Sequence, residues 1–262
     1  MSKRVAVVGA LGRMGERVRA AVAAHDALVL GGALEAPGHA GVGSEIDGVV
    51  VGDDPKAVLA GCDVVIDFSV PASTLANLRA AADLGVAYVT GTTGFDEAGK
   101  GEIAAAAEHI PVVHAPNFSV AVNVLTWLVR EAARKLGPDY DAELFEIHHG
   151  AKRDAPSGTA LHLAEAIAEG RALSREQLDD HLRLERAGEI GARPAGEIGV
   201  ATLRGGDNAG EHTVYFVGGG ERIELIHRAH TRDHFARGAA RAASWLVGRP
   251  TGLHRFEDIL GL

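Results

Sequence analysis

The sequence predicts an α/β protein made of two parts: a Rossmann-like, doubly wound parallel sheet and a smaller α+β substrate domain with a mixed sheet. Two observations predict the first part. Short apolar runs alternate with helical patterns over the first 118 or so residues, and a glycine turn directly follows the first run. The second part is predicted by strand-like runs that follow one another without helices between them. We therefore place domain boundaries at residues 1–118, 119–228 and 229–262, and expect the last segment to pack back on the first domain.

The first part opens with Val5 to Val8, a continuous apolar run typical of a strand buried on both faces. The glycine turn then leads into apolar residues at helical spacing, and 29–35 is the next strand. This strand–turn–helix–strand unit is the opening of a doubly wound fold. The alternation continues with strands predicted at 64–68, 86–90 and 111–113, and helices predicted from Pro71 towards Gly85 and over 97–107.

The second part begins with a long helix over 120–136, which Gly137-Pro138 ends. Its other elements are a strand at 141–149, a helix from near Ser157, a polar helix and loop over 171–197, strands at 199–203, 213–217 and 222–227, and a helix over 235–247.

Composition narrows the possible partners. The chain has 262 residues and a formal net charge of −9, which argues against a general nucleic-acid binder. It lacks an apolar run of the roughly 20 residues that span a bilayer, and we see no signal-peptide core. Cys62 is the only cysteine and is expected to be buried. We expect a cytoplasmic protein with neither a membrane nor a nucleic-acid partner.

The turn Gly9-x-x-Gly12-x-x-Gly15 is a variant of the dinucleotide fingerprint. Glycines allow a tight bend and let backbone N–H groups approach a pyrophosphate at the start of a helix. A glycine-rich loop with only a packing role is the alternative. The cofactor residues predicted here are Gly9, Ala10, Gly12, Arg13, Met14 and Gly15.

Glu35 ends the second predicted strand, about 20 positions after Gly15, where an acidic side chain usually binds the ribose 2′-hydroxyl of the cofactor. A carboxylate there repels a 2′-phosphate, and Ala36 and Pro37 supply no arginine to bind one. NADH is therefore predicted over NADPH, although Arg13 could partly compensate. The alternative is a solvated carboxylate at the end of a strand.

The most informative stretch runs from Glu146 to Ala160 and contains two imidazoles, an ammonium group and a helix start. If His148 and His149 lie on a strand, they point to opposite faces and have different roles. Histidine suits proton transfer because its ordinary pKa is roughly 6.5. Lys152 adds a cation that can hold a carboxylate or donate a second proton. A purely structural role for the histidines is the alternative.

The helix start at 154–159 is a candidate anion site. Ser157 or Thr159 can cap this helix, and its free N–H groups attract a carboxylate. Gly158 would let that carboxylate approach the backbone, so we assign both capping and substrate binding to this end.

We also consider a metal site, because three histidines lie close together in the sequence: His227, His230 and His234. No cysteine or carboxylate set completes a tetrahedral site around them, so we expect no metal.

These motifs together resemble the bacterial 4-hydroxy-tetrahydrodipicolinate reductases (dihydrodipicolinate reductases) of lysine and diaminopimelate biosynthesis. The resemblance covers nearly the whole chain and is most specific in the last two of its blocks. The blocks are Val8 to Gly15, Asp67-Phe68-Ser69-Val70-Pro71, Gly91-Thr92-Thr93-Gly94-Phe95, Ala115-Pro116-Asn117-Phe118-Ser119, His148 to Ala160 and Gly210-Glu211-His212-Thr213.

The resemblance implies an NAD(P)H-dependent oxidoreductase that transfers hydride to a small cyclic dicarboxylate. It implies that His148 is the proton donor and Lys152 a second donor, and that His149, Gly158 and Thr159 contact the substrate. It also implies a homotetramer assembled through the sheet of the substrate domain. The residues implied to border the nicotinamide are Gly91, Thr92, Thr93, Ala115, Pro116, Asn117 and Phe118.

The chain departs from many such relatives at two places. Gly150-Ala151 replaces a polar or basic pair, and Ala36 replaces a basic residue, which again favours NADH. Two other readings stay open: another two-domain NAD(P)-dependent dehydrogenase, and a non-catalytic nucleotide sensor.

Overall fold

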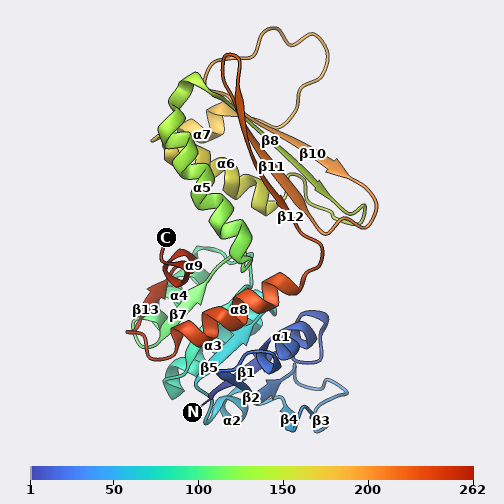
Figure 1. Cartoon of the computed structure of the whole chain (residues 1–262). Helices are drawn as coiled ribbons and strands as arrows, with labels where there is room; N and C mark the ends of the chain where they lie inside the picture. Colours follow the sequence, from blue (N-terminus) through green and yellow to red (C-terminus); the bar gives the residue numbers. More distant parts are fainter. Residues whose placement is uncertain (1) are drawn as a thin grey trace. The chain divides into compact units, whose positions relative to one another are not determined.

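The computed structural model describes residues 2–262 and divides the chain into two compact units (Figure 1). Unit 1 ends at Val120 and resumes with Asp233–Leu262, and unit 2 is Ala121–Arg232. The C-terminal segment of the chain therefore belongs to the same unit as the N-terminal one. Among the described residues, no helix is both long and apolar enough to cross a membrane.

Unit 1 is built on an eight-stranded sheet in the order β13-β7-β6-β5-β1-β2-β4-β3. All neighbouring pairs are parallel except β3 and β4. The strands are β1 (Lys3–Val8), β2 (Leu28–Leu34), β3 (Glu45–Ile46), β4 (Val49–Gly52), β5 (Val64–Asp67), β6 (Ala87–Thr90), β7 (Pro111–His114) and β13 (Gly252–His254). The helices are α1 (Arg13–Ala23), α2 (Pro55–Leu59), α3 (Pro71–Leu84), α4 (Glu97–Ala107), α8 (Asp233–Leu246) and α9 (Phe256–Leu260).

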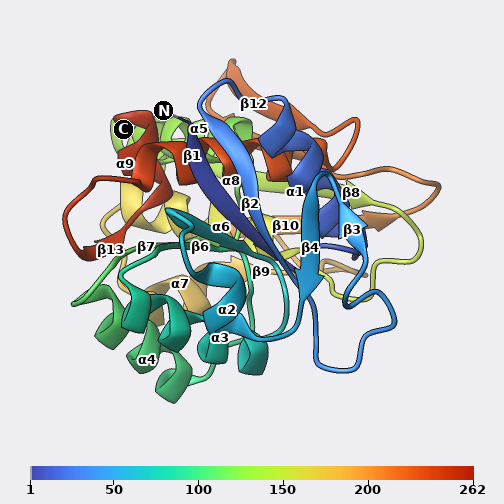
Figure 2. The ribbon, with the colours of Figure 1, turned by 90° about the horizontal axis from the view of Figure 1, so that it is seen from below.

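Helices cover both faces of this sheet, as Figure 2 shows. Val5 and Val7 of β1 point into a core shared with α1 and α8, whereas Ala6 and Val8 point into a core shared with α3 and α4. Both sets are buried, which explains why β1 reads as a continuous apolar run. The predicted doubly wound parallel sheet is confirmed.

The strand order reverses at β1, which lies between β2 and β5. Strands β2 and β4 extend the sheet on one side, and β5, β6, β7 and β13 extend it on the other. Ligands of doubly wound folds bind beyond the carboxyl ends of the strands at such a reversal. The glycine turn follows the carboxyl end of β1 and is therefore at this position.

Five short elements of unit 1 were not predicted: β3, β4, α2, β13 and α9. A tight turn joins β3 to β4, with positive φ at Asp47 and Gly48. Helix α2 begins at Pro55, and the Asp54 carboxylate caps it by accepting the Lys56 N–H at 3.0 Å. Elements of two to five residues are too short to show a hydrophobic period.

Unit 2 contains a mixed five-stranded sheet in the order β12-β11-β8-β10-β9. Strand β8 is parallel to β10 and antiparallel to β11, which confirms the predicted mixed sheet. The elements are α5 (Val120–Leu136), which starts one residue before the unit, the 3₁₀ helix η1 (Gly137–Asp139), β8 (Asp141–His148), α6 (Gly158–Gly170), α7 (Arg175–His181), β9 (Leu182–Arg183), β10 (Ile198–Arg204), β11 (Glu211–Val217) and β12 (Arg222–Arg228).

The two faces of this second sheet differ. Ala142 and Leu144 of β8 are buried in a core that residues of α5 and α6 complete. Glu146 and His148 continue the same alternation at the carboxyl end of β8 and are also buried. The strand thus places two polar side chains, two residues apart, at the end of an otherwise apolar face.

Candidate active site

The glycine turn of unit 1 has the geometry of a nucleotide cradle. Gly9 has φ +64°, and the Gly12 N–H donates to the Gly9 carbonyl at 2.9 Å, immediately before α1 begins at Arg13. A β-carbon at Gly15 would overlap the Gly9 carbonyl oxygen and lie 2.8 Å from Ala10 Cα. Backbone atoms occupy the space that a side chain at position 15 would need. The turn therefore packs tightly against the start of α1, where its backbone N–H groups lie.

Glu35 directly follows β2 and is bound to this turn. Its Oε1 accepts the Leu11 N–H at 2.7 Å, and Glu35 itself is half-buried. The carboxylate therefore helps to shape the glycine turn, a role that sequence reasoning did not anticipate. Arg13 and Ala36 are exposed, whereas Met14 is half-buried against the core.

Two further loops follow β6 and β7. The Thr92 N–H donates to Thr90 Oγ1 at 3.1 Å, and the buried Thr92 hydroxyl accepts from Thr74 at 2.8 Å. Gly91 lies against the Phe68 ring, which leaves no room for a β-carbon, and Thr93 is exposed. The first loop is thus fixed from within and presents Thr93 to solvent.

The second loop is anchored by Ala115, whose N–H donates to the Thr90 carbonyl at 3.2 Å. Phe118 is 1% exposed and packs edge-on against Phe68 and Phe256, with ring centroids 5.5 and 5.3 Å away. Its ring is a core residue of unit 1. Pro116 is exposed and Asn117 half-buried, so they form the accessible part of this loop.

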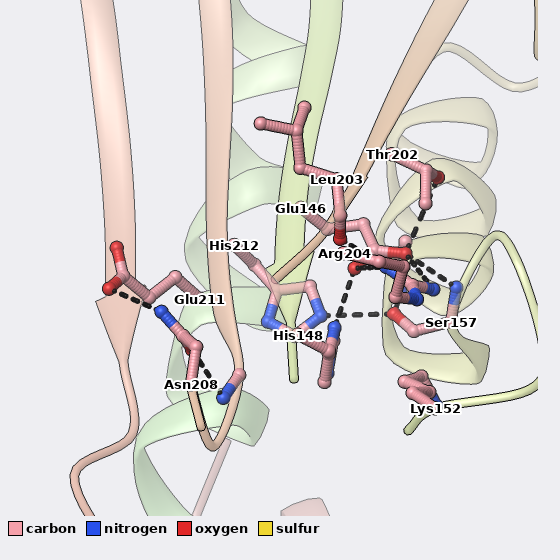
Figure 3. A network of polar contacts seen from close by, with 12 residues as sticks. Glu146, His148, Lys152, Ser157, Thr202, Leu203, Arg204, Asn208, Glu211 and His212 are labelled. Atoms are coloured by element: carbon pink, nitrogen blue, oxygen red, sulfur yellow. Dashed lines mark hydrogen bonds and ion pairs between the residues drawn. The ribbon is translucent and has the colours of Figure 1, made fainter. Parts of the chain in front are cut away.

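In unit 2, His148 is paired with Glu146 on the same strand. His148 Nδ1 lies 2.5 Å from Glu146 Oε2, and the two side chains share a face because they are two residues apart on β8. Glu146 is completely buried and His148 is 9% exposed. Figure 3 shows this pair at the centre of a polar network.

Arg204 holds the Glu146 carboxylate in a two-pronged ion pair. Its Nη1 donates to Oε2 and its Nη2 to Oε1, both at 2.9 Å. Arg204 lies opposite His148 in the β8–β10 register. The Ser157 N–H adds a third bond to Oε1 at 2.9 Å. Both carboxylate oxygens of Glu146 are therefore occupied by donors.

The pKa of Glu146 reflects this setting. Burial alone raises it, but the hydrogen bonds from His148, Arg204 and the Ser157 backbone outweigh burial and lower the pKa to about 2. Glu146 is consequently an ionised carboxylate near neutral pH.

His212 of β11 lies beside His148, with ring centroids 5.2 Å apart in an edge-on arrangement. Its Nε2 is 3.1 Å from Ser157 Oγ, and its Nδ1 has no hydrogen-bond partner among residues 2–262. Burial, followed by the charge of His148, lowers the pKa of His212 to about 3. His212 is therefore a neutral ring next to His148.

The second nitrogen of His148, Nε2, makes no hydrogen bond within the part of the chain that the structure describes. It lies against Gly210, where a β-carbon would be only 2.8 Å away, and Gly210 has φ +141°. The glycine therefore keeps a side chain at position 210 from covering the Nε2 edge of the ring. His148 thus has one nitrogen bound to Glu146 and one free for a ligand.

Lys152 and His149 lie in the loop after β8 and have other partners. Lys152 Nζ donates to both Asp154 oxygens, at 2.9 and 2.8 Å, and this ion pair lowers the pKa of Asp154. His149 Nε2 lies 2.9 Å from Arg232 Nη2. Because a guanidinium group only donates, His149 Nε2 accepts this bond. The two adjacent histidines therefore have separate partners.

Ser157 is the N-cap of α6, with its hydroxyl accepting the Ala160 N–H at 3.1 Å. Capping by Ser157 is confirmed, while Gly158 and Thr159 form the first helical positions. Gly158 is exposed, with open space around its α-carbon. The helix start therefore presents backbone to solvent beside the His148 network.

Sequence reasoning assigned no role to Glu146, Arg204 or His212. Glu146 could have been found, because it lies two residues before His148 on an alternating strand and must share its face. Arg204 could not, since only the sheet register brings it there, whereas His212 was marked only by its place in the block Gly210-Glu211-His212-Thr213. The described residues contain no group of three or more histidine, cysteine, aspartate or glutamate side chains that could hold a metal ion.

Sequence comparisons match the chain to dihydrodipicolinate reductases along nearly its whole length. Sequence models of the N- and C-terminal parts of dihydrodipicolinate reductase match residues 3–118 and 121–260. The chain is 54% identical over 264 residues to the 4-hydroxy-tetrahydrodipicolinate reductase of Anaeromyxobacter sp. (strain Fw109-5), covering 98% of this chain and 97% of the relative. It is 48% identical over 268 residues to the enzyme of that name from Geobacter metallireducens, covering 99% of each chain.

A solved structure shows the same fold. The dipicolinate-bound dihydrodipicolinate reductase from Paenisporosarcina sp. TG-14 superimposes with a TM-score of 0.79 at 24% identity, covering 97% of this chain and 98% of that one.

Proposed function

Because the chain belongs to the dihydrodipicolinate reductase family, we propose that it reduces 4-hydroxy-tetrahydrodipicolinate to tetrahydrodipicolinate with a reduced nicotinamide cofactor. The reaction belongs to lysine and diaminopimelate biosynthesis. The observation that carries this proposal is the His148–Glu146 pair, with Lys152 and the start of α6 beside it. Membership of this family excludes the alternative that the chain is another kind of two-domain NAD(P)-dependent dehydrogenase.

The reaction needs a proton donor for a ring that has gained negative charge. His148 meets this need because its Nε2 is uncovered while Nδ1 is bound to an ionised carboxylate. A protonated His148 would donate through Nε2, and Glu146 would stabilise the charge that the ring carries before the transfer.

The substrate's carboxylates need fixed positive groups. Lys152 supplies an ammonium group whose present partner, the Asp154 side chain, is 62% exposed. A substrate carboxylate would compete with Asp154 for this ammonium group. The backbone at Gly158 and Thr159 supplies helix-start N–H groups, and His149 a further donor.

The cofactor, when bound, supplies the hydride. Residues of the glycine turn (Gly9, Ala10, Gly12, Arg13, Met14 and Gly15) would hold its pyrophosphate, because the turn has the tight backbone geometry that this group requires. Glu35 would bind the ribose through Oε2, since Oε1 accepts the Leu11 N–H. The loops at Gly91, Thr92 and Thr93 and at Ala115, Pro116, Asn117 and Phe118 would border the nicotinamide.

NADH is the preferred cofactor in this proposal. The acidic side chain of Glu35 and the exposed, uncharged Ala36 offer a 2′-phosphate a repulsive group and no cation. The enzyme would work in the cytoplasm, where reduced nicotinamides are supplied.

Assembly into a homotetramer is also proposed, through the face of the second sheet that α5 and α6 leave uncovered. Leu203 of β10 and Ile226 of β12 lie on this face and are 47% and 43% exposed. A sheet face with large exposed apolar side chains is typical of a protein interface.

Turnover is the direct test. The substrate is generated from pyruvate and aspartate semialdehyde by a coupling enzyme, and absorbance of the reduced nicotinamide is followed with NADH and NADPH in parallel. Loss of absorbance that depends on substrate supports the proposal. Nucleotide binding without turnover on either cofactor would contradict it and favour a nucleotide sensor.

A further inference from the structure

We propose that Glu146 is a positioning residue that keeps the proton of neutral His148 on Nδ1, so that Nε2 is the nitrogen that exchanges a proton with the substrate. This inference rests on the proposed function and adds a residue to its machinery. Glu146 does not itself reach the substrate, because its side chain is completely buried.

The bond between His148 and Glu146 fixes which ring nitrogen carries the proton. An ionised carboxylate has no proton to donate, so the 2.5 Å bond between His148 Nδ1 and Glu146 Oε2 requires the hydrogen to be on Nδ1. In the neutral ring the other nitrogen then carries a lone pair. The bond therefore selects one tautomer.

Hydrogen-bond donors around the Glu146 carboxylate keep it ionised. Arg204 donates to both of its oxygens, and the Ser157 N–H donates to Oε1. All of these groups are donors, so protonating the carboxylate would break at least one of these bonds. The low pKa of Glu146, about 2, agrees with this arrangement.

Other charged and titratable groups also lie near His148. Arg204 lies on β10, His212 on β11 with His227 of β12 behind it, and Lys152 pairs with Asp154 in the following loop. Arg204 is neutralised by Glu146, Lys152 by Asp154, and His212 is uncharged. Glu146 is thus the anion that bonds directly to the His148 ring.

The two ring nitrogens of His148 differ in their access to a ligand. Gly210 leaves the Nε2 edge uncovered, whereas Nδ1 faces the interior of unit 2. In the other tautomer, the neutral ring would carry its only proton on Nε2. The Nδ1 lone pair would then face Glu146 Oε2, so that two acceptors would oppose each other inside unit 2. The geometry therefore separates an inner, fixed nitrogen from an outer, reactive one.

The first experiment uses the intact protein labelled with ¹⁵N-histidine. Nitrogen chemical shifts and couplings at basic pH identify the tautomer of His148, whose signals are assigned by their loss in His148→Gln. We expect the Nδ1–H form. An Nε2–H ring would overturn the inference. This readout needs no turnover, so it tests the role of Glu146 separately from the proposed reaction. Absence of turnover by the wild-type protein would contradict the proposed reaction but would leave the tautomer measurement intact.

The second experiment compares Glu146→Gln with Glu143→Gln. Glu143 lies on the same strand and also pairs with two arginines, Arg186 and Arg193, but on the other face. We expect Glu146→Gln to lower kcat about 10- to 10⁴-fold with little change in KM, the range for residues that orient a reactive imidazole. The limb of the pH profile that requires protonated His148 should move to lower pH.

The control variant should leave both kcat and the pH profile unchanged, and Glu146→Asp, which keeps the charge, should recover part of the rate. A wild-type pH profile in Glu146→Gln would overturn the inference. So would equal losses in the two glutamine variants, which would indicate a structural effect alone.

Discussion

Gly15 packs so closely on Gly9 that a β-carbon at position 15 would overlap the Gly9 carbonyl oxygen. The obstructing atoms belong to the backbone and cannot rotate away. The start of α1 and the glycine turn are therefore one rigid unit.

Gly15→Ala should displace α1 from the turn. We expect at least about a tenfold loss of NADH affinity by calorimetry, and a loss of roughly 1–3 kcal/mol in the free energy of unfolding, the usual range for overpacking. Gly101→Ala is the matched control, because Gly101 lies within α4 of the same unit with open space around it. That variant should be neutral or more stable by up to about 1 kcal/mol. Equal behaviour of the two variants would contradict the packing argument.

Ala36→Arg should shift cofactor preference towards NADPH. An arginine next to Glu35 would pair with the 2′-phosphate, and charge-assisted pairs of this kind correspond to about a tenfold or larger change in relative affinity. The measurement is the ratio of kcat/KM for NADPH and NADH. Ala98→Arg adds the same charge at an exposed position of α4 and should leave the ratio unchanged. If Ala36→Arg leaves it unchanged as well, Glu35 and Ala36 do not set the preference.

Long elements of the fold were predictable from sequence because burial repeats along them. The predicted helices at 97–107 and 120–136 coincide with α4 and α5. The hairpin of β3 and β4 was missed, because Asp47-Gly48 is a turn signal between strands of only two and four residues.

The candidate site was predictable only where it is local in sequence. His148, Lys152 and Ser157 lie within ten positions, at the end of β8, in the following loop and at the N-cap of α6. Arg204 is 58 residues from Glu146 and reaches it through the β8–β10 register, which no motif encodes. The binding of Glu35 to the Leu11 N–H depends in the same way on the packing of β1 beside β2.

His212 should make unit 2 less stable as the pH falls. Its folded pKa of about 3 lies below the ordinary 6.5, so between these values the unfolded chain binds a proton that the folded chain does not. Stability is then lost on acidification by up to about 1.4 kcal/mol per pH unit. Glu146 adds little to this pH dependence, because its folded pKa is about 2 and its stabilising effect is already present above the ordinary value of 4.5 and is lost only at lower pH.

The test measures urea unfolding at pH 7.5, 6.5 and 5.5 in a Trp245→Phe background, where Trp127 of unit 2 is the remaining tryptophan. His212→Asn should be less stable than its parent at pH 7.5 but should lose less stability on acidification. Parallel pH dependences would show that His212 titrates normally in the folded protein.

Leu203→Asp should weaken the proposed tetramer, because a charge would be buried on the uncovered sheet face of unit 2. Light scattering should report a mass below four times 27.2 kDa, with a folded chain by circular dichroism. Val50→Asp places the same charge at an exposed apolar position of unit 1 and should leave the mass unchanged. An unaltered tetramer in Leu203→Asp would exclude this face as the interface.

His148→Gln should lower kcat by about 10²- to 10⁴-fold, the usual scale for losing a general acid. KM for the substrate should change little, because Lys152 and the start of α6 still hold its carboxylates. His109→Gln makes the same substitution at an exposed position of unit 1 and should keep full activity. A wild-type turnover number in His148→Gln would exclude His148 as the donor and leave Lys152 as the candidate. Loss of activity in both variants would instead point to an effect of histidine replacement on the assay or the fold.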